Sequence, residues 1–147
     1  MSYVLELSKQ NHWINQLNQT ITFGDVIFFN GPLGVGKTTL IAKLAQLRNI
    51  HTQPTSPTFS KMNIYSIDHH RHLLHIDAYN FKHQGEIDNL GLDMFEPQTT
   101  IMFIEWSEKL PDDYFTPKYS INMSFSGDVS SRIVKILDHH GSEIAFD

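Results

Sequence analysis

One short stretch of this chain constrains its structure more than any other, namely Gly31-Pro32-Leu33-Gly34-Val35-Gly36-Lys37-Thr38. It fits the pattern G-x-x-x-x-G-K-[ST] of a phosphate-binding loop. A continuous apolar run at residues 26–29 precedes it, and apolar residues recur at helical spacing over residues 37–47. The sequence therefore predicts a buried strand, a glycine-rich turn and an amphipathic helix, which is the context that such a loop needs in order to bind phosphate.

The spacing within this loop follows from the chemistry of phosphate binding. Glycines allow the backbone to curl so that successive N–H groups point at one phosphate, and the positive N-terminal end of the following helix adds to their effect. We expect the Lys37 ammonium to reach the β- and γ-phosphates of ATP, and the Thr38 hydroxyl to be a ligand of Mg²⁺. Lys37 is thus a predicted catalytic residue as well as a nucleotide contact.

A phosphate loop also needs acidic partners at the carboxyl ends of neighbouring strands, where open α/β sheets bind their ligands. Two apolar runs end in an acid: residues 101–104 lead into Glu105, and residues 73–76 lead into Asp77. One acid would hold Mg²⁺, directly or through water, and the other would orient the attacking water. The residues alone leave open which acid takes which role.

Two further groups of side chains are candidates of lower specificity. The proline-stiffened loop at residues 53–58 carries hydroxyls, and Thr58 within it would supply a second ligand to the metal or the γ-phosphate. Histidines gather at 69–75 and at 139–140. A histidine-rich tract is only a compositional hint of metal binding, so we interpret these as a polar hairpin turn and polar strand ends.

The remaining hydrophobic pattern predicts an α/β fold with three layers, a mixed central β-sheet and the architecture of a P-loop NTPase. Ser8 is a predicted helix cap. The predicted strands are 3–7, 26–29, 59–67, 72–77, 101–104, 119–123 and 132–137, and the predicted helices are 10–17, 37–47 and, with weak periodicity, 84–95.

Composition bounds the class of protein. The length of 147 residues favours a single domain over 1–147, and the absence of cysteine excludes disulfides and thiolate chemistry. There is no signal-like N-terminus and no apolar run of membrane-spanning length, so we expect a soluble cytoplasmic protein with no membrane partner. A net charge of −5 and only three arginines, at 48, 71 and 132, disfavour tight nonspecific binding of nucleic acid.

In order and spacing these motifs resemble the bacterial TsaE (formerly YjeE) family, the small ATPase of tRNA threonylcarbamoyladenosine biosynthesis. The resemblance covers about residues 4–137. Its segments are Gly31 to Thr38 with Thr39, then Ser56-Pro57-Thr58-Phe59, His75-Ile76-Asp77-Ala78-Tyr79, Glu86-Ile87 to Gly91-Leu92, and Ile104-Glu105-Trp106.

This resemblance implies that Thr38 and Glu105 serve Mg²⁺, that Asp77 supports hydrolysis and that Trp106 lies beside the nucleotide. It also implies partnership with the paralogous pair TsaB and TsaD. ATP hydrolysis would then reset that complex between turnovers, and tRNA would be engaged only indirectly.

The chain departs from the family pattern at three places. Pro32 stands where a polar residue is usual, Asn80 stands where an arginine is usual, and an N-terminal threonine is replaced near His12-Trp13.

Three other functions compete with this interpretation. A small-molecule P-loop kinase generally needs lid arginines, and the sequence has no arginine-rich lid. A GTP-dependent switch would match D-x-x-G at residues 88–91, but the chain lacks an N-K-x-D segment. An ATP-dependent binding module without significant hydrolysis stays open, because slow turnover and no turnover look alike in sequence.

Overall fold

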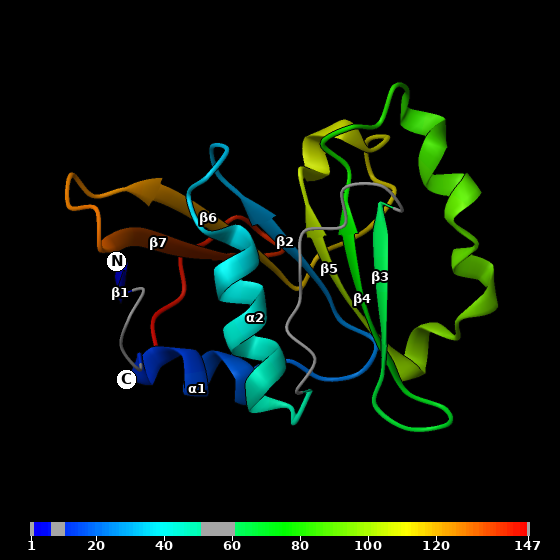
Figure 1. Ribbon diagram of the computed structural model, residues 1–147, viewed down its shortest axis with the longest axis horizontal. Coiled ribbons are helices and arrows are strands. Elements are labelled where there is room, and N and C mark those ends of the chain that lie inside the picture. The colour runs from blue at the N-terminus through cyan, green and yellow to red at the C-terminus, as the bar shows by residue number, and fades with distance from the viewer. Residues whose placement is uncertain (1, 7–10, 51–60, 147) are drawn as a thin grey trace.

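The structure, a computed structural model, describes residues 2–6, 11–50 and 61–146 (Figure 1). A seven-stranded sheet with the strand order β1-β7-β6-β2-β5-β4-β3 forms its centre. The strands are β1 (Tyr3–Glu6), β2 (Val26–Asn30), β3 (Met62–Ser66), β4 (His72–Asp77), β5 (Thr100–Glu105), β6 (Tyr119–Phe125) and β7 (Ser131–Asp138). The two α-helices are α1 (His12–Thr20) and α2 (Lys37–Leu47).

The sheet is parallel in its middle and antiparallel towards its edges. β2 pairs in parallel with both β5 and β6, and β5 pairs in parallel with β4. β1, β7 and β3 add antiparallel pairs on the two sides. The predicted α/β class with a mixed sheet is therefore confirmed, and the strand that precedes the glycine-rich loop lies in the middle of the parallel part.

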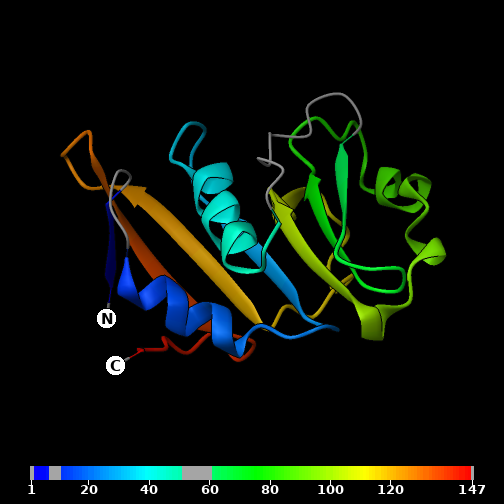
Figure 2. The ribbon, with the colours of Figure 1, turned by 60° about the horizontal axis from the view of Figure 1, so that its bottom comes forward.

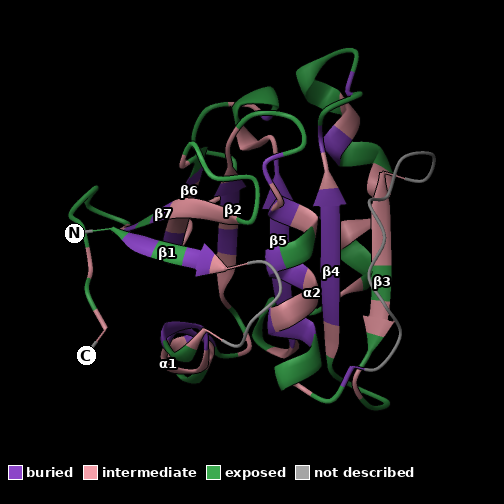
Figure 3. Cartoon of the chain, turned by 60° about the vertical axis from the view of Figure 1, so that its left-hand side comes forward, coloured by how far each residue is buried: buried purple, intermediate pink, exposed green. Residues whose placement is uncertain are grey.

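Helices cover one face of this sheet and short 3₁₀ segments cover part of the other (Figures 1 and 2). Side-chain alternation along β2 directs Ile27 and Phe29 into the core that α1 and α2 close. On the opposite face, Ile87 from the 3₁₀ segment Gln84–Leu90 packs with apolar residues of β4 and β5. β4 and β5 are buried along almost all of their length (Figure 3). β5 also pairs with β2, the strand that leads into the glycine-rich loop.

Two predicted helices differ from the observed ones. The first begins at His12, not at residue 10, with Asn11 at the N-cap position, and the predicted cap Ser8 lies outside the described residues. The Asn11 side chain instead bridges to the backbone N–H and C=O of Glu6. The predicted helix at 84–95 is broken into 3₁₀ turns, because Gly91 adopts a left-handed conformation with φ 77°.

The second helix matches its prediction in length but not in every facing residue. Leu40, Ile41 and Leu44 are fully buried, whereas Leu47, which continues the same helical spacing, is 42% exposed in the last turn, where Ala45 is buried instead. No helix in the described ranges combines the length and the apolar character needed to cross a bilayer.

Candidate nucleotide site

The glycine-rich loop joins the end of β2 to the start of α2, and two of its glycines are required by the local geometry. Gly36 occupies the N-cap position of α2 in a left-handed conformation, φ 109° and ψ 24°. Gly31 has φ 152°, and a Cβ there would lie 2.6 Å from the Met123 carbonyl oxygen and 2.9 Å from Val35 Cγ1. The loop thus depends on glycine both for its turn and for its close packing on β6.

Lys37, the first residue of α2, is folded back over this loop. It is only 5% exposed, and its Nζ donates a hydrogen bond of 2.5 Å to the Gly31 carbonyl oxygen. The same ammonium lies 4.0 Å from the centroid of the Trp106 ring. Burial lowers the pKa of Lys37, and the nearby carboxylates of Glu105 and Asp77 oppose that shift.

Glu105 ends β5 within reach of α2 and of β4. Its Oε2 accepts a hydrogen bond of 3.2 Å from the Thr38 hydroxyl, and it lies 2.5 Å from Nε2 of His75. Glu105 is 3% exposed and His75 is fully buried. The acid that the family resemblance assigns to the metal and the hydroxyl predicted as a metal ligand are therefore direct neighbours.

Asp77 lies at the end of β4 in register with Glu105, on the same face of the sheet. Its Oδ1 accepts a hydrogen bond of 2.9 Å from the Tyr79 N–H. Beyond Asp77, the Tyr79 ring packs 4.9 Å from the ring of Trp106, which adopts a left-handed backbone conformation with φ 60°. Left-handed geometry is uncommon for a large aromatic residue, and such positions gather at functional sites.

These side chains surround one cavity of about 450 Å³. Its lining residues are Leu33, Gly34, Gly36, Lys37, Thr38, Thr39, Asp77, Tyr79, Asn80, Glu105 and Trp106. Backbone from a helix N-terminus, one ammonium and two carboxylates thus converge at the carboxyl ends of the parallel strands. This combination suits a phosphate group with a bound cation.

The oxygen donors fit Mg²⁺ better than a metal held by protein alone. Among the described residues no three His, Cys, Asp or Glu side chains form a cluster able to hold a metal ion. Mg²⁺ characteristically takes one or two protein oxygens and completes its shell with phosphate oxygens and water. The Thr38 and Glu105 oxygens meet that requirement at the end of the cavity nearest α2.

Three predicted loop contacts do not line the cavity. The Val35 side chain is fully buried in the core and does not face the cavity. The Val35 carbonyl oxygen accepts a hydrogen bond of 2.9 Å from Nε of Arg132. Gly31 and Pro32 are not among the lining residues, although their carbonyl oxygens lie 2.5 Å and 3.5 Å from Lys37 Nζ. Pro32 has no N–H to offer a phosphate. Thr58 lies outside the described residues.

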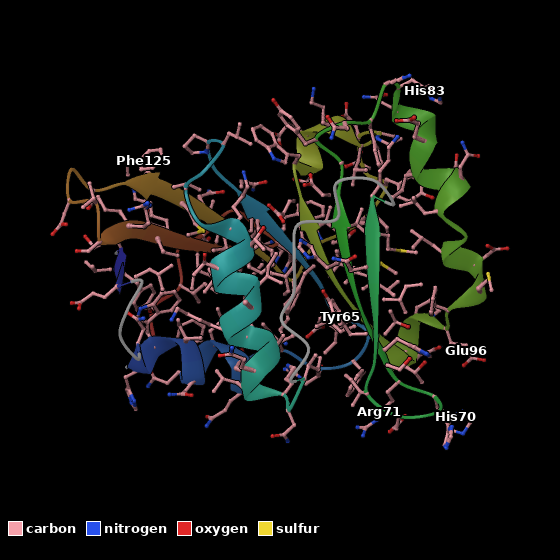
Figure 4. The ribbon with its side chains drawn as sticks, viewed as in Figure 1. Tyr65, His70, Arg71, His83, Glu96 and Phe125 are labelled. Carbon is pink, nitrogen blue, oxygen red and sulfur yellow. The ribbon has the colours of Figure 1, made fainter. Side chains whose placement is uncertain are left out.

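The sequence interpretation missed the place of His75, which is a buried partner of Glu105 and not a polar strand end. The signal was the period-two spacing that puts His75 on the same strand face as Asp77. By contrast His70 does lie in the β3–β4 turn, at the end of the sheet remote from the 3₁₀ turn at His83 (Figure 4). The sequence also gave no sign of the Ser107–Asn30–Asn122 hydrogen-bond chain beside the loop.

Comparisons with known proteins show the family to which this chain belongs. A sequence model of the family described as "Threonylcarbamoyl adenosine biosynthesis protein TsaE" matches residues 5–134. The tRNA threonylcarbamoyladenosine biosynthesis protein TsaE of Nostoc sp. is 37% identical over 125 residues, which cover 82% of this chain and 74% of the relative. Its namesake in Synechocystis sp. is 29% identical over 118 residues, with coverages of 74% and 71%.

One solved structure extends the likeness to the fold. Bacillus subtilis YdiB matches with a TM-score of 0.59, covering 91% of this chain and 82% of its own. The sequence identity is 23%, so this match concerns the fold alone.

Proposed function

Because this chain belongs to the TsaE family of threonylcarbamoyl adenosine biosynthesis proteins, we propose that it binds ATP with Mg²⁺ and hydrolyses it slowly in support of that tRNA modification. Hydrolysis would reset a complex of TsaB and TsaD, and tRNA would be engaged only through that complex. The observation that carries the proposal is the hydrogen bond between Thr38 and Glu105 at the head of the cavity.

This hydrogen bond prepares the hydroxyl for a cation. A threonine hydroxyl has one proton to donate and two lone pairs to offer. Because the Thr38 proton is directed to Glu105 Oε2, its lone pairs are left for Mg²⁺, while Glu105 holds the metal or a water bound to it. When bound with the nucleotide, Mg²⁺ supplies positive charge to the β- and γ-phosphates.

Lys37 and Asp77 would complete the chemistry. The Lys37 ammonium now rests on the Gly31 carbonyl oxygen, and it would exchange this neutral acceptor for phosphate oxygens, which form stronger charge-assisted hydrogen bonds. Asp77 lines the same cavity as the loop and would orient the attacking water. Trp106 would lie against the nucleotide at the cavity wall.

The arginine positions disfavour the kinase alternative. Arg48 donates to the Asn18 and Ile21 carbonyl oxygens, Arg71 pairs with Asp68, and Arg132 binds the loop backbone. The chain has only these three, so it cannot supply a lid arginine to a transferring phosphoryl group. A GTP switch is disfavoured too, because residues 88–91 do not line the cavity.

The first test is nucleotide binding by Lys37→Ala and Lys37→Met, measured by calorimetry with ATP and Mg²⁺. We expect both to lose most of the affinity, because neither can neutralise phosphate charge, and the methionine variant keeps the buried stem that packs beside Trp106. Unchanged ATP affinity in either folded variant would refute nucleotide binding at this loop.

The second test separates an ATPase from a passive binding module. Phosphate release is measured with the purified chain alone and with TsaB and TsaD, and association is measured with ATP, with ADP and without nucleotide. We expect weak turnover alone, a rise with the partners, and association favoured by ATP. Partners that neither change turnover nor respond to the nucleotide would support the binding-module alternative instead.

A further inference from the structure

His75 is a buried polar side chain to which the proposed ATPase chemistry gives no task. It lies within β4 with no exposed surface, while its neighbours in register are Asn63 on β3 and Phe103 on β5. Its Nε2 is 2.5 Å from Glu105 Oε2. Because an ionised carboxylate can only accept hydrogen bonds, Nε2 must be the donor.

Glu105 is consequently held from two sides through a single oxygen. Oε2 accepts from His75 on β4 and from the Thr38 hydroxyl on α2. Both donors are on regular elements and not on loops, so the rotation of the carboxylate is fixed by the packing of β4 and α2 against β5. A carboxylate held in this way presents its remaining lone pairs in one direction.

The opposite nitrogen of the ring shows that stability alone does not account for this histidine. Nδ1 of His75 is buried and has no hydrogen-bond partner among the described residues. Leaving a buried polar group unpaired costs about 1–3 kcal/mol. An apolar residue would avoid that cost at this buried place beside Phe103, which leaves the contact with Glu105 as the reason for an imidazole.

We propose that His75 is a positioning residue that orients the Glu105 carboxylate towards the cation bound with the nucleotide. The inference rests on the proposed function, since it requires Mg²⁺ at the Thr38–Glu105 end of the cavity. Groups that orient a metal-binding side chain typically change metal affinity by about 10–100-fold when they are removed. His75 touches neither metal nor nucleotide and acts through Glu105.

The test compares variants that keep or remove one N–H. The amide nitrogen of glutamine reaches about as far from the backbone as imidazole Nε2, so His75→Gln keeps the donor, whereas His75→Leu removes it and stays apolar. ATP affinity is measured by calorimetry with Mg²⁺ and with EDTA. The ratio of the two affinities measures how much Mg²⁺ contributes to ATP binding. We expect His75→Leu to lose about tenfold or more of this ratio with unchanged affinity in EDTA, and His75→Gln to stay near the wild type.

A double variant shows whether the effect passes through Glu105. Glu105→Gln alone should lower the Mg²⁺ ratio, and adding His75→Leu to it should change nothing further, because residues that act as one unit are not additive. A ratio unchanged in His75→Leu, or a full loss that adds to that of Glu105→Gln, would overturn the positioning role.

Two further outcomes are distinguishable from these. If His75→Leu does not fold, as judged by circular dichroism, His75→Asn replaces it, since its amide stops at the position of Nδ1 and cannot reach Glu105. A wild-type protein whose ATP affinity ignores Mg²⁺ would overturn the proposed metal site, and the role of His75 with it.

Discussion

Replacing Gly31 by alanine tests whether the phosphate loop is positioned by close packing on β6. An alanine Cβ would lie 2.6 Å from the Met123 carbonyl oxygen, a backbone atom of a paired strand, and 2.9 Å from Val35 Cγ1, which is fully buried. Neither atom belongs to a flexible side-chain end. The loop would therefore have to move away from β6, or the strand would have to give way.

The expected size of the effect has two parts. Backbone held at φ 152° is strained for any residue with a Cβ, and such strain costs about 1–3 kcal/mol. Overpacking a tightly filled site costs a further ~1–3 kcal/mol. We therefore expect Gly31→Ala to lower the free energy of unfolding by about 2–6 kcal/mol, a large fraction of the roughly 5–15 kcal/mol that holds a domain together.

Gly34→Ala is the matched control in the same loop. Gly34 has φ 79°, but a Cβ there would meet no atom within 4 Å, so only the left-handed backbone cost of about 1–2 kcal/mol remains. Both variants are unfolded with urea without nucleotide, so that the comparison does not depend on what the loop binds. Equal losses of stability in the two variants would refute the packing account of Gly31.

Three further predictions concern other contacts of the structure. Glu105→Ala should weaken Mg²⁺-dependent ATP binding, whereas Asp77→Ala should still bind ATP but release phosphate more slowly. Calorimetry and turnover assays test this, and the reverse pattern would exchange the roles of the two acids. Arg132→Met should lower the free energy of unfolding by about 1.5–3 kcal/mol, the usual worth of a hydrogen bond from a charged group, since Val35 O loses its donor; urea unfolding that matches the wild type would contradict this. The His70 N–H and the Arg71 guanidinium lower the pKa of Asp68 to about 2. The stability that Asp68 contributes should therefore be complete above its unfolded pKa near 4 and be lost as pH falls towards 2. A difference in melting temperature between Asp68→Asn and the wild type that stays constant over that pH range would contradict this prediction.

The parts of the fold that follow from local sequence were predictable. A continuous apolar run identifies β2 and β5 as buried strands, because both faces of the parallel centre are covered. The helix after the loop has enough apolar positions at helical spacing to predict a helix from Lys37 to about Leu47, and α2 spans Lys37–Leu47. Element ends were less predictable: α1 begins where Asn11 engages the Glu6 backbone, and that contact depends on where β1 ends.

The site was predictable as a set of residue types and strand ends, but not as contacts. Residues at the carboxyl ends of β4 and β5 were expected near the loop, and Asp77 and Glu105 do line one cavity with it. Which side chain each acid would meet depends on strand order and register. The pairing of Glu105 with His75 requires that β4 and β5 be neighbours, and nothing within either segment states that.

The arrangement of positive charge gives a structural reason to expect dependence on another protein. The cavity holds two carboxylates and would receive a triphosphate, yet Lys37 is the only lysine or arginine among the described residues that line it. The arginine nearest in sequence to the loop, Arg48, donates to carbonyl oxygens at the end of α1, and the cavity-lining residue Asn80 carries no charge. An arginine supplied by a second protein raises phosphoryl-transfer rates by about 10³–10⁵. We therefore expect this chain to hold ATP and Mg²⁺ well but to turn ATP over slowly until a partner brings a cation to the open side of the cavity beside Tyr79 and Asn80.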